Sequence, residues 1–117
     1  VFGAGRIVNP RTARSQFIGG MTMGLSMALH EEGVLDPASG HVVNHDLVGY
    51  HVATNADVGS MDATWVEEAD PHVNPLGTKG IGEIGIVGAA ASVLNAAYNA
   101  TGIRVRDVPM RPDDLLR

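Results

Sequence analysis

Residues 13–32 read ARSQFIGGMTMGLSMALHEE and contain two regular stripes of side chains. The first stripe is apolar and consists of Phe17, Met21, Leu25 and Leu29. The second stripe is small and consists of Gly20, Gly24 and Ala28. A spacing of four predicts a helix over residues 13–32, with Thr12 as its N-cap and Gly33 as its C-terminal stop. Interior glycines each cost up to about 1 kcal/mol relative to alanine, so the small stripe predicts close approach to a neighbouring element.

A second helix is expected over residues 83–100, ended by Thr101 and Gly102. Its apolar face is formed by Ile84, Val87, Ala91, Leu94 and Tyr98. The rest of its surface is small, with Gly85, Gly88, Ala89, Ser92 and Ala96. A helix of this kind can be buried on nearly all sides.

The remaining segments are shorter and more polar. Asp36 to Gly40 read DPASG, a turn in which Pro sets φ and Gly supplies a positive φ. Short extended or strand segments are expected at residues 1–9, 33–35, 41–43, 61–67 and 104–108, and a short terminal helix at 112–117. Residues 44–60 and 70–82 are predicted to be loops. The expected fold class is therefore α+β, with two main helices packed with a few short strands.

Composition excludes several classes of protein. The 117 residues carry a formal net charge of -5 and contain no Cys, which excludes a disulfide scaffold, a Cys-based metal site and a Cys-bound iron–sulfur cluster within this chain. The net negative charge argues against nucleic-acid binding, which needs basic side chains for the phosphates. No apolar run reaches the roughly 18 residues of a membrane span. The chain starts at Val1 without a basic and apolar leader, has only 4% aromatic residues and has 15 Gly. These features favour a fragment of a larger protein.

The glycine-rich stretch KGIGEIG at residues 79–85 is the densest chemical signal. It contains G-x-G-x-x-G, but a dinucleotide-binding motif needs a buried strand immediately before it, and residues 70–78 contain two prolines and no apolar run. Gly80 and Gly82 would allow backbone to approach a ligand closely. Glu83 is then either a general base held at this turn or an acid that merely complements a helix dipole.

Other candidate residues carry weaker signals. The amide of Gln16 could bind a heteroaromatic ligand, or Gln16 could be an ordinary polar helix residue. Lys79 could neutralise a phosphate or simply be solvated. His41 and His45 could form a metal pair, but no third ligand is evident. No metal-ligating residue is therefore assigned.

Four stretches resemble the C-terminal part of the molybdopterin-binding subunit of the xanthine dehydrogenase/aldehyde oxidase family, most closely its bacterial aldehyde oxidoreductases. They are GRIVNPRTARSQFIGG (5–20), GLSMALHEE (24–32), YHVATNADV (50–58) and the long block at 74–116 that begins NPLGTKGIGEIG. The resemblance covers most of the chain. It implies that residues 1–117 are a C-terminal fragment of a molybdopterin-binding domain.

The resemblance also implies a function and a set of site residues. Glu83 matches the family's catalytic base in the oxidation of aldehydes or N-heterocycles with water as the oxygen source. Gln16, Lys79, Gly80 and Gly82 match residues that line the cofactor, which is molybdopterin cytosine dinucleotide with molybdenum. Expected partners are the rest of the subunit, an iron–sulfur subunit, an FAD subunit and a small aldehyde or heterocyclic substrate.

The chain departs from the family pattern in its length. The upstream stretches that hold most of the pterin and shape the substrate pocket are absent, so this chain alone is expected to be inactive. The alternative is a non-catalytic isolated domain or partner-binding remnant of the family. A soluble bacterial protein of cytoplasm or periplasm is expected.

Overall fold

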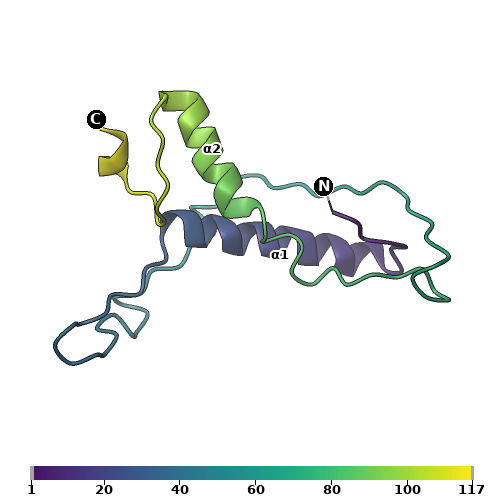
Figure 1. The fold of residues 1–117 in the computed structure, drawn as a ribbon, viewed down its shortest axis with the longest axis horizontal. Coiled ribbons are helices and arrows are strands. Elements are labelled where there is room, and N and C mark those ends of the chain that lie inside the picture. The colour runs from purple at the N-terminus through teal and green to yellow at the C-terminus, as the bar shows by residue number, and fades with distance from the viewer. Residues whose placement is uncertain (1, 117) are drawn as a thin grey trace.

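The structure, a computed structural model, describes residues 2–116 and is built around two helices. These are α1 (Pro10–Leu29) and α2 (Ala89–Thr101), followed by a short 3-10 helix, η1 (Pro112–Leu115). Helix α2 rises from the middle of α1 at an angle (Figure 1). The predicted pair of packed helices is confirmed.

Helix α1 begins three residues earlier than predicted. The side chain of Asn9, not Thr12, caps it by accepting hydrogen bonds from the N–H groups of Arg11 (3.1 Å) and Thr12 (3.2 Å). Pro10 occupies the first helical position, where its fixed φ suits the helix and its missing N–H is not needed.

The C-terminal end of α1 also differs from the prediction. The helix ends at Leu29, and the N–H groups of His30 and Glu31 both donate to the carbonyl of Ser26, at 2.8 and 3.1 Å. These two hydrogen bonds end the helix four residues before Gly33. The predicted stop at Gly33 is therefore wrong, and Gly33 is not among the glycines with positive φ in the described chain.

Helix α2 begins six residues later than predicted. Residues 82–88 form successive turns, in which the N–H of Ile86 donates to Glu83 (3.2 Å) and that of Ala89 to Ile86 (3.1 Å). The three- and four-residue apolar spacing continues through these turns, which explains the wrong boundary. The predicted end is confirmed, because Gly102 adopts φ 76° and its N–H donates to the carbonyl of Tyr98.

β-pairing is reduced to two isolated bridges within residues 2–116, Gly5 with Thr78 and Leu35 with Val42. The second bridge closes the predicted hairpin, and Gly40 in its turn has φ +73° as expected. Residues 61–67 and 104–108 form no strand in the described chain, so these strand predictions are wrong. The predicted terminal helix is the single 3-10 turn of η1.

The small stripe of α1 packs directly on the start of α2. A Cβ atom built on Gly20 would lie 3.0 Å from the backbone of Gly85, and one on Gly24 would lie 2.3 Å from the Cβ of Ala89. The glycines therefore allow the two backbones to approach closely, as the sequence predicts.

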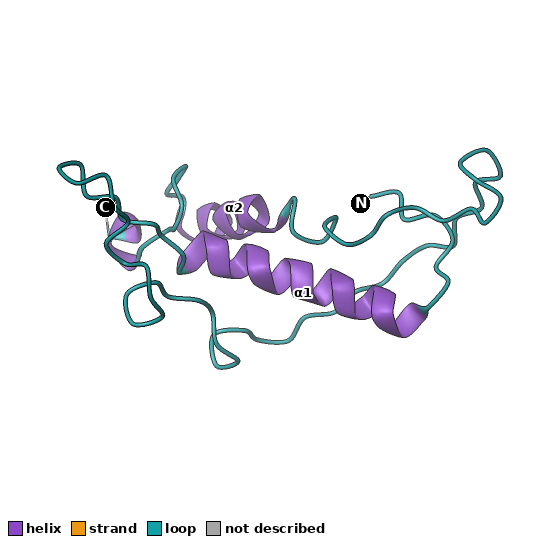
Figure 2. Cartoon of the chain, turned by 90° about the horizontal axis from the view of Figure 1, so that it is seen from below, coloured by secondary structure: helices purple, strands orange, loops and turns teal. Residues whose placement is uncertain are grey.

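The opposite face of α1 is covered by residues 53–65, an irregular segment with a turn at 55–57. The N–H of Ala53 donates to Ser26 Oγ (2.9 Å), and the hydroxyl of Thr22 donates to Met61 Sδ (3.5 Å). Further along, the rings of Phe17 and Trp65 lie 6.3 Å apart. Figure 2 shows this segment and α2 on opposite sides of α1.

The chain is elongated and has little core of its own. Its radius of gyration is 17.8 Å, against about 13–14 Å for a compact domain of this length. Ala13 and Ala28 are the only buried apolar side chains among residues 2–116. Many larger apolar side chains are exposed, including those of Leu35, Leu47, Val48, Val66, Leu76 and Val87. The expected α+β class with two main packed helices is confirmed, with its β content limited to the two bridges among residues 2–116.

No helix within residues 2–116 is both long and apolar enough to cross a membrane.

Candidate functional site

Glu83 lies on the turn at residues 82–88, with its side chain exposed. Because α2 begins at Ala89 and has no acidic residue in its first turn, Glu83 does not serve as a helix N-terminal acid. The interpretation of Glu83 as a mere complement to the helix dipole is therefore wrong. Its role as a catalytic base stays a prediction that this geometry permits.

The turn is anchored on α1 two residues after Glu83. A Cβ atom on Gly85 would lie 2.8 Å from the carbonyl oxygen and 3.2 Å from the Cα of Phe17. This close contact brings the turn beside the position that follows Gln16 in α1. The side chain of Gln16 is exposed, as is that of Glu83. The two residues therefore lie on either side of the backbone contact between Gly85 and Phe17.

The turn is preceded by a cluster of charges around Lys79. The ammonium nitrogen of Lys79 lies 2.5 Å from Glu68 Oε1 and 3.2 Å from Asp70 Oδ2. The second oxygen of Glu68 accepts a hydrogen bond of 2.6 Å from the N–H of Gly5. We call Gly5, Glu68, Asp70 and Lys79 the Lys79 clamp. It joins three segments that are distant in sequence.

The clamp is half-buried, with 26%, 35% and 31% of the side chains of Lys79, Glu68 and Asp70 exposed. Lys79 is thus not a freely solvated lysine, because its ammonium group lies against two carboxylates. Neutralisation of a phosphate by Lys79 stays a prediction. A contact between the cofactor and the backbone from Lys79 to Gly82 stays a prediction.

Hydrogen bonds and charges within and beside the clamp shift the pKa of each of its ionisable groups toward the charged form. The hydrogen bond from Lys79, followed by that from the Gly5 N–H, lowers the pKa of Glu68. The backbone N–H of His72, and then Lys79, lower the pKa of Asp70. Glu68 and then Asp70 raise the pKa of Lys79. All three groups are therefore charged together at neutral pH.

The loop before Lys79 is fixed by Asn74. Its Oδ1 accepts hydrogen bonds from the N–H groups of Leu76 (3.0 Å) and Thr78 (3.2 Å), and its Nδ2 donates to the carbonyl of Thr78 (2.7 Å). The N–H of Arg6 donates to the carbonyl of Gly77 (2.8 Å). The chain is consequently held firmly up to Lys79.

Beyond Lys79 the backbone is open on the side where side chains would project. A Cβ atom on Gly80 or on Gly82 would meet no atom within 4 Å. The N–H groups of Gly80, Gly82 and Glu83 donate to no acceptor within residues 2–116. The stretch therefore offers unused donors and space to a group supplied from outside this part of the chain.

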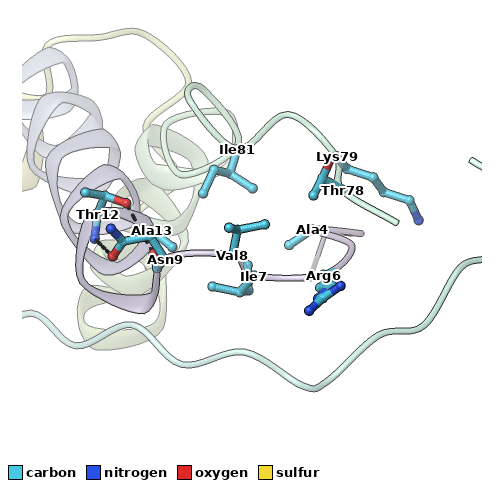
Figure 3. Close-up of a pocket in the computed structure, with 10 residues that line it drawn as sticks. All are labelled: Ala4, Arg6, Ile7, Val8, Asn9, Thr12, Ala13, Thr78, Lys79 and Ile81. Atoms are coloured by element: carbon cyan, nitrogen blue, oxygen red, sulfur yellow. Dashed lines mark hydrogen bonds between the residues drawn. The ribbon is translucent and has the colours of Figure 1, made fainter. Parts of the chain in front are cut away.

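A cavity of about 210 Å³ lies beside the same stretch, between the N-terminal segment and residues 78–81. Its walls include Ile7, Val8 and Ile81, while the side chain of Lys79 extends away from Ile81 (Figure 3). Among the described residues, Lys79 is the predicted site residue that lines this cavity, whereas Gln16 and Glu83 do not line it. The cavity is distinct from the exposed turn.

The sequence reasoning missed Glu68, Asp70 and Asn74. Glu68 and Asp70 are two residues apart in an extended segment, so their side chains project to the same side. Lys79, nine residues beyond Asp70, is the basic residue of the glycine-rich stretch. These two facts could have predicted an ion pair, although not its link to Gly5.

Two sequence alternatives can be compared with this geometry. A dinucleotide-binding unit would need a strand before Gly80, and residues 61–77 form none in the described structure. The dinucleotide-binding interpretation is therefore wrong.

His41 and His45 belong to no group of three His or carboxylate side chains that could hold a metal ion within residues 2–116.

Comparison with known proteins connects this chain to a family. Residues 1–59 match the model of the molybdopterin cofactor-binding domain. The chain is 51% identical to the "aldehyde oxidoreductase molybdenum-binding subunit PaoC" of Escherichia coli over 99% of its own length and 16% of that subunit. It is 37% identical to an E. coli xanthine dehydrogenase molybdenum-binding subunit, over 98% of its length and 15% of that subunit.

A solved structure shares the fold. The crystal structure of quinoline 2-oxidoreductase from Pseudomonas putida 86 superimposes with a TM-score of 0.81 at 29% identity, covering 95% of this chain and 14% of that one. The chain thus spans about one sixth of the length of the subunits it matches. On the match to the family model, which covers residues 1–59 of 117, the chain belongs to the molybdopterin cofactor-binding domain family.

Proposed function

We propose that this chain is the part of a molybdenum hydroxylase that carries its catalytic base, Glu83. The complete enzyme would oxidise aldehydes or N-heterocycles with water as the oxygen source. The observation that carries the proposal is the placement of an exposed carboxylate on a turn that is anchored on both sides, at Lys79 and at Gly85. A general base needs such a fixed position relative to its substrate.

The residues around Glu83 fit a cofactor brought by the rest of the subunit. Gly80 and Gly82 leave open space, their N–H groups donate to no acceptor in the described part of the chain, and the amide of Gln16 is exposed beside the same turn. In the proposal Gln16 and the backbone from Lys79 to Gly82 hold molybdopterin cytosine dinucleotide. When bound, this group would supply the two-electron redox chemistry.

Glu83 would move a proton in the reaction. Oxidation of an aldehyde with water gives a carboxylic acid, two protons and two electrons. The carboxylate of Glu83 would accept one proton as the oxygen derived from water attacks the substrate carbon. Its exposed position on the turn suits transfer of that proton onward to solvent.

The rest of the proposed machinery lies outside these residues. The chain is proposed to be a C-terminal fragment of the molybdopterin-binding domain, completed by the rest of the subunit. Iron–sulfur and FAD centres on other subunits would receive the electrons. The exposed apolar side chains, such as those of Leu47 and Val66, support burial against further protein. The alternative, a partner-binding remnant without chemistry, shares this feature but predicts no role for Glu83.

The substitution Glu83→Gln in the complete enzyme tests the proposal. It keeps the size and exposure of the side chain and removes its basicity. We expect near-total loss of aldehyde turnover with the molybdenum and pterin content unchanged. Turnover comparable to that of the unmodified enzyme would contradict the assignment of the base.

A further inference from the structure

The Lys79 clamp lies immediately before the turn that carries Glu83. Lys79 is the one clamp residue that the sequence predicts as a site residue. We propose that Glu68 is a positioning residue: through the ammonium of Lys79 and the N–H of Gly5 it fixes the backbone from which the Glu83 turn departs. This inference rests on the proposed function of Glu83.

The contacts of Glu68 divide between two segments. One carboxylate oxygen binds Lys79 at 2.5 Å, and the other accepts the Gly5 N–H at 2.6 Å. Glu68 therefore ties the N-terminal segment and the glycine-rich stretch to the extended segment at residues 61–70. Asp70 adds a second, longer contact to Lys79, at 3.2 Å.

The geometry leaves a short span, residues 80–84, whose only hydrogen bond within the described chain is the one that the carbonyl of Glu83 accepts from the N–H of Ile86. Lys79 is held by the clamp, Gly85 is held against Phe17, and between them Gly80 and Gly82 have open space at their Cβ positions. Two glycines in five residues give this span much backbone freedom of its own. The position of Glu83 must therefore depend strongly on the two anchors.

The neighbouring Glu67 provides a matched control. It is also a glutamate, its side chain is exposed, and it makes no hydrogen bond or ion pair within the described part of the chain. Glu68→Ala and Glu67→Ala thus remove the same side chain and the same charge. They differ in whether the clamp is lost.

The first measurement is hydrogen–deuterium exchange of the complete, cofactor-loaded enzyme. We expect faster exchange at the amides of residues 80–84 in Glu68→Ala, and unchanged exchange there in Glu67→Ala. Molybdenum content should be the same in both variants. Equal exchange in the two variants, or loss of molybdenum from Glu68→Ala, would overturn the proposal.

The second measurement is steady-state turnover. Displacement of a catalytic group by about 1 Å can cost on the order of 100-fold in rate, so Glu68→Ala should lower kcat by about 10- to 100-fold and leave KM within about twofold. Lys79→Arg should restore most of the activity that Lys79→Met loses, because it keeps the cation. A rise in KM alone, or equal activity of the two Lys79 variants, would contradict positioning.

These results separate the two proposals. If Glu83→Gln keeps its turnover, the proposed function fails, whatever exchange at residues 80–84 shows. If Glu83→Gln is inactive and Glu68→Ala is as active as Glu67→Ala, the base assignment stands and the positioning role fails. Asp70→Asn, which weakens the longer contact, should show a smaller change in the same direction as Glu68→Ala.

Discussion

Gly24 in α1 and Ala89 at the start of α2 occupy one contact point, where a Cβ atom on Gly24 would lie 2.3 Å from the Cβ of Ala89. Such a distance is far below van der Waals contact. The two helices can therefore meet here only because one of the two residues has no side chain.

The first prediction concerns this contact. Gly24→Ala forces the helices apart, and overpacking of this kind costs about 1–3 kcal/mol, so the complete subunit should unfold at a lower temperature. Gly19→Ala is the matched control, because a Cβ there meets no atom within 4 Å; it should stabilise α1 by about 0.4–1 kcal/mol. Thermal unfolding of both variants checks this, and equal melting temperatures would contradict the packing.

The second prediction concerns the start of α1. Asn9→Ala removes the side chain that accepts from the N–H groups of Arg11 and Thr12, and loss of an N-cap costs about 0.5–2 kcal/mol. Asn99→Ala, at an exposed position of α2, should cost nothing measurable. Chemical unfolding of the complete subunit compares the two. A cost for Asn99→Ala as large as that for Asn9→Ala would rule out a specific capping effect.

The third prediction concerns the end of α2. Gly102 has φ 76°, and a side chain in this left-handed region costs about 1–2 kcal/mol. Gly102→Ala should therefore destabilise the subunit, whereas Gly88→Ala should not, because Gly88 has φ −102° and open space at its Cβ position. Differential scanning calorimetry of the two variants provides the comparison. The assignment fails if Gly88→Ala is the more destabilising change.

The fourth prediction concerns the pH dependence of the Lys79 clamp. Because folding lowers the pKa of Glu68, its contribution to stability is present above its ordinary value of 4.5 and is lost as pH falls through the folded pKa. Because folding raises the pKa of Lys79, its contribution is present below 10.5 and is lost as pH rises through the folded pKa.

The measurement for this prediction is the free energy of unfolding of the complete subunit and of its Lys79→Met variant between about pH 3 and about pH 11. This range extends beyond the ordinary pKa values of both a glutamate and a lysine side chain. The stability lost on substitution should be greatest between the two limits and should shrink at both ends. Arg106→Met, at an exposed position without an ion pair in the described chain, should show no such profile. A loss that is independent of pH would show that the clamp does not act through its charges.

The helices were predictable because their evidence is local. The stripe of Gly20 and Gly24 predicted both a helix and a close neighbour, and both are confirmed. The boundaries were harder to predict. Asn9 caps α1 from three residues before Thr12, and turns at residues 82–88 keep the apolar spacing of a helix without its hydrogen bonds.

The site was predictable only in part. The glycines around Glu83 drew attention to the turn, but the clamp that precedes it depends on contacts between residues far apart in the chain. Glu68 and Gly5 are 63 residues apart. Their pairing follows from the path of the extended segment along α1, which no local pattern encodes. The absence of strand pairing at residues 61–67 has the same origin, because α1 rather than another strand lies beside them.

The covering of α1 by later parts of the chain has a consequence for synthesis on the ribosome. Helix α1 is complete at Leu29, yet its contacts come from Ala53, Met61 and Gly85, and from Met110, whose N–H donates to Ala28 at 2.7 Å. At about 5–20 residues per second, several seconds pass between the emergence of the helix and that of its last partner. Until each of those segments emerges, α1 lacks the contacts that the segment supplies, so the packing of α1 is completed last by the end of the described chain.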